Sequence, residues 1–154
     1  MGGKDLILLY NSLVRSILEY SSVTYGPMLT KSQSNRLEQV QKRCLRIMFG
    51  YLKTYQDLLS ESGLETLKHR REKALTRFLD KTLKNPNYAP LFPFNKSLRP
   101  GLRGTKNYLE SFARTQRLYN SPLFTMKSLL NNSPSSQQFQ ETVVDLSYLF
   151  NDPE

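Results

Sequence analysis

The segment from Glu65 to Lys84 constrains the fold most, because two kinds of side chain repeat along it at helical spacing. Taking 100° per residue, its apolar side chains gather on one side of a helix: Leu64, Leu67, Leu75 and Phe78. Five cations, hereafter the basic stripe, line up on a second side: Arg70, Lys73, Arg77, Lys81 and Lys84. Such a division between apolar and charged sides is typical of a helix packed on a core. We therefore expect an amphipathic helix with a basic stripe about 21 Å long.

Two earlier segments also predict helices. Residues 4–20 carry apolar side chains at helical spacing: Leu6, Leu9, Tyr10, Leu13, Ile17 and Tyr20. So wide an apolar face predicts a buried helix, and Gly26-Pro27 then redirects the chain. A second helix is expected to begin near Ser32 or Ser34, which can cap its free amides, and to stop at Gly50. The apolar stripe expected along it consists of Leu37, Val40, Cys44, Ile47 and Met48.

The remaining segments complete an all-α prediction. Short helices are expected over 55–62 and 123–131, and several prolines and glycines between residues 85 and 122 predict an irregular segment. Since 154 residues suit one ordinary domain, we expect a small helical domain of about four or five helices over residues 1–131. Residues 132–154 read as a polar linker followed by an apolar strip from Phe139 to Phe150.

The charge of the chain favours a polyanionic partner. Lys and Arg number 22 against 13 acids, a net charge of +9, and residues 31–84 hold 13 of the cations but only 6 of the acids. Besides the basic stripe, the second predicted helix carries four cations: Arg36, Lys42, Arg43 and Arg46. These nine side chains are the candidate contacts to the phosphate backbone of RNA or DNA. Basic helix faces are also common as plain solvated surface, and that interpretation stays open.

Signatures of catalysis, metal binding and membrane insertion are missing from the sequence. The single Cys44 and single His69 cannot assemble a zinc site or an internal disulfide. There is no Gly-rich phosphate loop, no HExxH, no GxSxG and no pair of neighbouring aspartates. No apolar run approaches the ~18 residues of a membrane span. We therefore expect no catalytic residue, no metal, no cofactor and no membrane contact, and an intracellular location in nucleus or cytoplasm.

An ordered series of short blocks resembles a known family. The blocks that carry this likeness are Leu18-Glu19-Tyr20, Gly26-Pro27, Leu37-Glu38, Tyr55-Gln56-Asp57-Leu58-Leu59, Gly63-Leu64-Glu65-Thr66-Leu67 and Arg70-Arg71, followed by Arg114-Thr115 and Leu129-Leu130-Asn131. In order and rough spacing they resemble the region after the polymerase core in reverse transcriptases of non-LTR retrotransposons, the LINE and jockey-like elements. The likeness covers about residues 8–131.

The resemblance implies a fragment of an RNA-directed DNA polymerase. In that family an endonuclease and a palm with a Tyr-x-Asp-Asp motif precede a helical thumb and tail, and this sequence contains only blocks of the tail. The implied role is to bind template RNA and primer DNA without sequence preference. Leu18-Glu19-Tyr20 and Leu37-Glu38 are then helix-packing positions, and Arg43 and Arg46 are the expected contacts. Two alternatives remain: a helical protein–protein interaction module that docks on a separate polymerase palm or another protein, and a non-functional retroelement relic.

Overall fold

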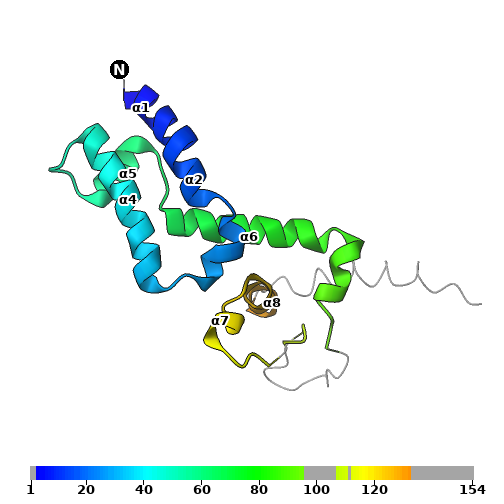
Figure 1. The fold of residues 1–154 in the computed structure, drawn as a ribbon. Coiled ribbons are helices and arrows are strands. Elements are labelled where there is room, and N and C mark those ends of the chain that lie inside the picture. Colours follow the sequence, from blue (N-terminus) through cyan, green and yellow to red (C-terminus); the bar gives the residue numbers. More distant parts are fainter. Residues whose placement is uncertain (1–2, 96–106, 111, 133–154) are drawn as a thin grey trace, which may run out of the picture.

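The computed structural model describes residues 3–95, 107–110 and 112–132, and they form an all-α fold (Figure 1). The elements in chain order are α1 (Gly3–Leu9), the π-helix η1 (Tyr10–Arg15), α2 (Ser16–Glu19), α3 (Ser22–Tyr25), the 3-10 helix η2 (Gly26–Met28), α4 (Lys31–Phe49), α5 (Tyr55–Ser62), α6 (Leu67–Leu83), the 3-10 helix η3 (Pro86–Leu91), α7 (Gln116–Tyr119) and α8 (Pro122–Asn132). In the described ranges the one β-type pairing is an isolated bridge between Phe94 and Tyr108. The all-α prediction is confirmed, and the predicted apolar strip at residues 139–150 lies outside the described residues.

The predicted helices are present with small shifts at their ends. The first is continuous from Gly3 to Glu19, since η1 joins α1 to α2 with helical backbone on both sides. The start of α4 differs from the prediction, because Thr30 caps it rather than Ser32 or Ser34. The Thr30 hydroxyl accepts the amide of Gln33 at 3.2 Å, and the Gln33 side chain accepts the Thr30 amide in return. No described helix is long and apolar enough to cross a bilayer.

Helix α6 joins the two halves of the described structure. Figure 1 shows α1, α2, α4 and α5 on the side of its N-terminal end, with α8 below its middle and α7 next to α8. On the first side the fully buried apolar side chains are Leu45, Leu58 and Leu67. On the second side one cluster consists of Leu75, Leu79, Phe92, Tyr108, Met126 and Leu130. Because α6 contributes to both sides, its orientation fixes where the basic stripe lies.

The apolar faces of the first two helices differ from the prediction. The structure buries Gln41 and Leu45 of α4 completely but leaves Val40 at 41% and Ile47 at 64% exposure. The covered face is therefore rotated by roughly a quarter turn from the predicted stripe. The reason is tertiary: α4 packs against α1, α5 and α6, and within this contact Gln41 makes hydrogen bonds to Tyr10, Tyr55 and Glu65.

The first helix is also less buried than expected. Tyr10 is 4% exposed, whereas Leu13, Ile17 and Tyr20 are 59%, 76% and 80% exposed. Helix α4 packs on α1, so one side of the helix is covered and the opposite side faces outward. The prediction that this wide apolar face is buried is therefore wrong for its outer half.

A buried hydrogen-bond network centred on Gln41 connects the helices of the first half. Its side-chain oxygen accepts the Tyr10 hydroxyl at 2.8 Å, and its amide nitrogen donates to the Tyr55 hydroxyl and to the Glu65 carbonyl, both at 3.0 Å. The Tyr55 hydroxyl donates to Glu38 at 2.7 Å. Burial raises the pKa of the Tyr10 and Tyr55 hydroxyls, so both remain protonated donors.

Glu38 also holds the start of α6. Its second carboxylate oxygen accepts the backbone amide of Lys68 at 2.7 Å, while the Thr66 hydroxyl accepts the amide of His69 at 3.2 Å. These two acceptors satisfy amides that an isolated helix leaves free. The expected packing role of Leu37-Glu38 thus has a concrete form, in which α4 fixes the N-terminus of α6.

Candidate nucleic-acid interface

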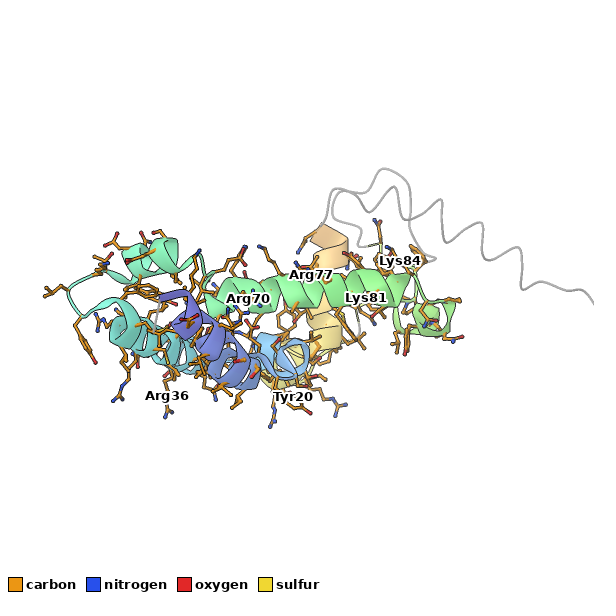
Figure 2. All side chains as sticks on the ribbon, turned by 90° about the horizontal axis from the view of Figure 1, so that it is seen from above. Tyr20, Arg36, Arg70, Arg77, Lys81 and Lys84 are labelled. Atoms are coloured by element: carbon orange, nitrogen blue, oxygen red, sulfur yellow. The ribbon has the colours of Figure 1, made fainter. Side chains whose placement is uncertain are left out.

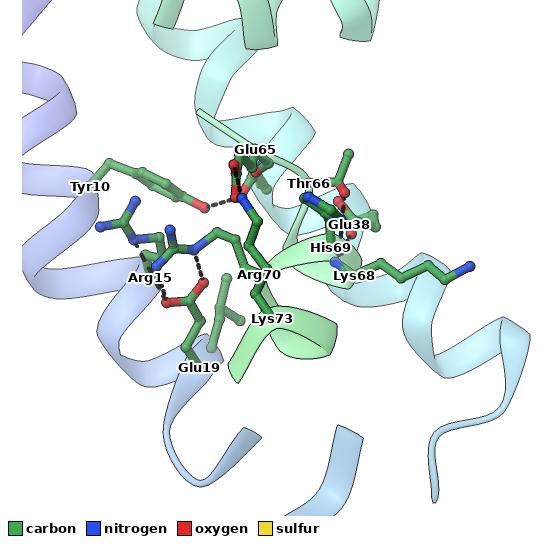
Figure 3. Close-up of polar contacts among 12 residues, drawn as sticks. Tyr10, Arg15, Glu19, Glu38, Glu65, Thr66, Lys68, His69, Arg70 and Lys73 are labelled. Atoms are coloured by element: carbon green, nitrogen blue, oxygen red, sulfur yellow. Dashed lines mark hydrogen bonds and ion pairs between the residues drawn. The ribbon is translucent and has the colours of Figure 1, made fainter. Parts of the chain in front are cut away.

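The basic stripe lies along α6 as predicted, but its first two members bind carboxylates of the same chain. Figure 2 shows Arg70, Arg77, Lys81 and Lys84 following one another along the helix. Arg70 makes a bidentate ion pair with Glu19 of α2, through Nε to one oxygen and through Nη2 to the other at 2.9 Å. The hydrogen bond that Arg70 donates to Glu19 raises the pKa of the guanidinium. Arg70 therefore holds α2 against α6 (Figure 3).

Lys73 is engaged in a similar way. Its ammonium donates to the Glu65 carboxylate, and this hydrogen bond is the main cause of a lowered pKa for Glu65. Both side chains are more than 40% exposed, so the pair is open to solvent and to salt. Lys73 is thus shared between an internal partner and the surface.

The second half of the basic stripe is unpaired. Arg77, Lys81 and Lys84 are exposed, and none of them forms an ion pair within the part of the chain that the structure describes. They span about 10 Å along α6, at seven steps of 1.5 Å. These three side chains, hereafter the open row, are the cations best placed to meet an external polyanion.

Of the four cations predicted on α4, two are exposed and two are half-buried. Arg36 and Arg43 are exposed, and Figure 2 shows Arg36 apart from the labelled residues of α6. The ammonium of Lys42 lies 5.9 Å from the centre of the Tyr55 ring, a cation–π contact. The Nε atom of Arg46 is buried and has no hydrogen-bond partner among the described residues. The predicted group on α4 is therefore not a single continuous surface with the open row.

Arg71, which interrupts the apolar side of α6, is buried and hydrogen-bonded. It is 7% exposed, and its Nη2 donates to the Ser34 hydroxyl of α4 at 2.7 Å. The stem of the side chain packs beside Gly26. Arg71 therefore connects α6 to α4, and it is not part of the candidate interface.

A polar hollow of about 370 Å³ lies between α2 and α6. The charged side chains that line it are Arg15, Glu19, Glu65, Arg70, Lys73 and Arg77. Arg15 lies 3.9 Å from Glu19, a weak ion pair between residues four apart on one helix. Ser22, which is 8% exposed, also lines the hollow. We refer to this feature as the cationic hollow.

Sequence reasoning missed the residues of the cationic hollow that lie outside α6. Neither Arg15 nor Ser22 carries a local signal that predicts a shared site. Arg15 and Ser22 reach the hollow through contacts between segments about 50 residues apart, as the Glu19–Arg70 pair illustrates.

The central position of Gln41 has a weak sequence signal, although Gln41 does not line the hollow. It lies four residues after Leu37 and four before Leu45, so the three side chains lie near one another on a helix.

Comparisons with known proteins identify no relative: no protein-family model, no curated protein and no solved structure matches the chain. Nor do three or more Asp, Glu, His or Cys side chains gather as a metal site anywhere in the described ranges.

Proposed function

We propose that this chain binds the phosphate backbone of RNA or DNA without sequence preference, in the manner of a reverse-transcriptase tail that lacks its catalytic palm. The observation that carries this proposal is the open row, three exposed cations in line on one helix with no carboxylate partner among the described residues. The ordered sequence blocks that resemble non-LTR retrotransposon enzymes supply the family context. No catalytic step is assigned to the chain.

The electrostatics support a backbone contact rather than base recognition. Phosphates of a strand recur every few ångströms, and a row of cations about 10 Å long can meet roughly three of them. Lysine and arginine contacts to phosphate position a protein on nucleic acid but carry no sequence information. The net charge of +9 adds a long-range attraction that is independent of sequence.

The dependence of affinity on salt tests this proposal. Neutralising about three phosphates gives a slope of about −2 to −2.7 for log K against log [salt], so affinity should fall roughly 20- to 40-fold between 50 and 200 mM salt. Fluorescence anisotropy with a labelled single strand and a labelled duplex measures this slope. If binding is absent at 50 mM salt, or unchanged at 500 mM, the proposal is refuted.

A charge-matched pair of variants locates the contact. Replacing Arg77, Lys81 and Lys84 with Gln should bring the slope close to zero, because the contacted phosphates keep their counterions. The control replaces Lys31, Lys53 and Lys68 with Gln, which lowers the net charge by the same amount at other exposed positions. The control should keep the wild-type slope. Equal losses in both variants would mean that only the overall charge matters.

A second candidate function rests on a different observation, the exposed apolar side of the first helix. Leu13 and Ile17 on the first helix, and Tyr20 directly after its end, are each more than half exposed. An outward apolar row of this kind favours a protein-binding surface. We propose a helical interaction module as the alternative. Sedimentation velocity at rising concentration, with nuclease present, should show self-association that Leu13→Ser with Ile17→Ser abolishes. A chain that stays monomeric and binds nucleic acid favours the first proposal.

A further inference from the structure

The cationic hollow differs from the open row because it is enclosed by side chains from several elements. Arg15 comes from η1, Glu19 from α2, Ser22 from α3, and the remaining charged residues come from α6 and the segment before it. Its volume of about 370 Å³ equals that of roughly twelve water molecules. The hollow therefore has room for a phosphate group together with part of a sugar.

The charges in the cationic hollow do not balance. Four cations line it against two carboxylates, which leaves a formal charge of +2. Both carboxylates already have cationic partners, Glu19 in Arg70 and Arg15, and Glu65 in Lys73. Arg77 has no ion-pair partner in the described ranges, and Arg15 reaches Glu19 only at 3.9 Å. The surplus charge is therefore carried by these two arginines.

The Ser22 side chain adds a further donor to the same hollow. Ser22 is 8% exposed and lines the hollow, and no hydrogen bond of its side chain is found among the described residues. By contrast, the first amides of α6 cannot serve an anion, because Glu38 and Thr66 already accept the amides of Lys68 and His69. Any anion here is held by side chains.

A larger hollow of about 500 Å³ on another side of α6 is a weaker candidate. Its buried cation, Arg71, already donates to Ser34, and apolar residues such as Pro27, Leu29 and Leu75 form part of its wall. It offers no buried side chain that lacks a partner. The cationic hollow is therefore the better anion site.

We propose that the cationic hollow binds one phosphate group of a nucleic-acid strand, clamped between Arg15 and Arg77, with the Ser22 hydroxyl as a further donor. Arginine suits this role because its planar guanidinium binds phosphate oxygens in pairs. A phosphate monoester carries about −1.5 to −2 at pH 7, which matches the surplus of +2 better than the −1 of a diester. Since Arg77 also begins the open row, a strand whose terminal phosphate occupies the hollow continues along Lys81 and Lys84. This inference rests on the proposed function.

The test compares three ligands by anisotropy and competition at 50 mM salt: a 5′-phosphorylated single strand, the same strand with a 5′-hydroxyl, and inorganic phosphate. The phosphorylated strand should bind about tenfold more tightly, as expected for one set of charge-assisted hydrogen bonds. Arg77→Gln and Ser22→Ala should each reduce this ratio towards one. Lys81→Gln should weaken both strands equally and leave the ratio unchanged, and Lys53→Gln should alter neither.

The possible outcomes separate the hollow from the proposed function. Equal binding of both strands, weakened by Ser22→Ala and competed by inorganic phosphate, means that the hollow holds an internal phosphodiester, which supports the site and rejects the terminal group. If Lys81→Gln weakens binding but Ser22→Ala and Arg15→Gln do not, the proposed phosphate site in the hollow is overturned while the proposed nucleic-acid binding is kept. If no strand binds, thermal unfolding decides: stabilisation by phosphate over chloride at equal ionic strength, lost in Arg77→Gln, keeps the hollow alone. No stabilisation rejects both. Circular dichroism confirms that each variant is folded.

Discussion

Replacing Gln41 with Leu should destabilise the chain strongly although the two side chains have similar size. Gln41 is fully buried and makes three hydrogen bonds, to Tyr10, Tyr55 and the Glu65 carbonyl. The substitution leaves the Tyr10 hydroxyl and the Glu65 carbonyl without partners, while Tyr55 keeps its bond to Glu38. Two unsatisfied buried groups cost about 1–3 kcal/mol each, and the greater hydrophobicity of leucine offsets part of this.

The expected net loss is roughly 2–4 kcal/mol, a large part of the ~5–15 kcal/mol of a typical domain. Urea unfolding followed by circular dichroism measures it directly. With a denaturant slope of about 2 kcal/mol/M, the midpoint should fall by about 1–2 M while the slope itself stays constant. A loss below about 0.5 kcal/mol would refute the reasoning, because buried groups left unpaired cannot be so cheap.

A double-mutant cycle separates the hydrogen bond from simple packing. Tyr10→Phe alone leaves the Gln41 oxygen unpaired and should cost about 1–3 kcal/mol. In the Gln41→Leu background the same change removes a hydroxyl that already lacks a partner, so it should cost close to nothing. Losses that add within about 0.5 kcal/mol would show that the two side chains do not act together.

Three further predictions follow from local geometry and charge. Gly63 ends α5 at φ +65°, so Gly63→Ala should lower the free energy of unfolding in urea by roughly 1 kcal/mol. Gly26→Ala should be nearly neutral, because its new Cβ meets Arg71 at an ordinary distance of 3.6 Å. Equal effects of the two substitutions would contradict the backbone argument. Thr66→Ala removes the cap of α6 and should cost about 1 kcal/mol, while Thr76→Ala within the same helix should not; no loss for Thr66 would contradict its capping role. The Lys73 ammonium lowers the pKa of Glu65 in the folded chain, so the stability that this ion pair contributes is present above the ordinary pKa of 4.5 and is lost as the pH falls through the lowered pKa. The stability difference between the wild type and Glu65→Gln should therefore be larger at pH 7 than at pH 3. A difference independent of pH would contradict the ion pair.

The local sequence pattern predicts where the cations of the candidate site lie, but not which of them are paired within the chain. The five cations of the basic stripe share one side of α6 because residues three and four apart lie together on any helix. The five cations are nevertheless not equivalent, because Arg70 forms an ion pair with Glu19 and Lys73 forms one with Glu65. The Glu19–Arg70 pair joins residues 51 positions apart, and no periodicity within a helix predicts such a contact.

Local sequence patterns are enough to predict that this chain is helical, where its main helices begin and end within a few residues, and that its positive charge concentrates in the middle. These properties depend on side chains within one or two turns of each other, through caps, breaks and helical spacing. Which helix faces are covered, and which cations stay open, follows instead from how the helices pack on one another. Coverage depends on partners distant in the chain: Gln41 replaces Val40 at the centre of the α4 contact because Tyr10, Tyr55 and Glu65 surround it with hydrogen bonds. The same packing brings Arg15 and Ser22 to the hollow beside Arg77.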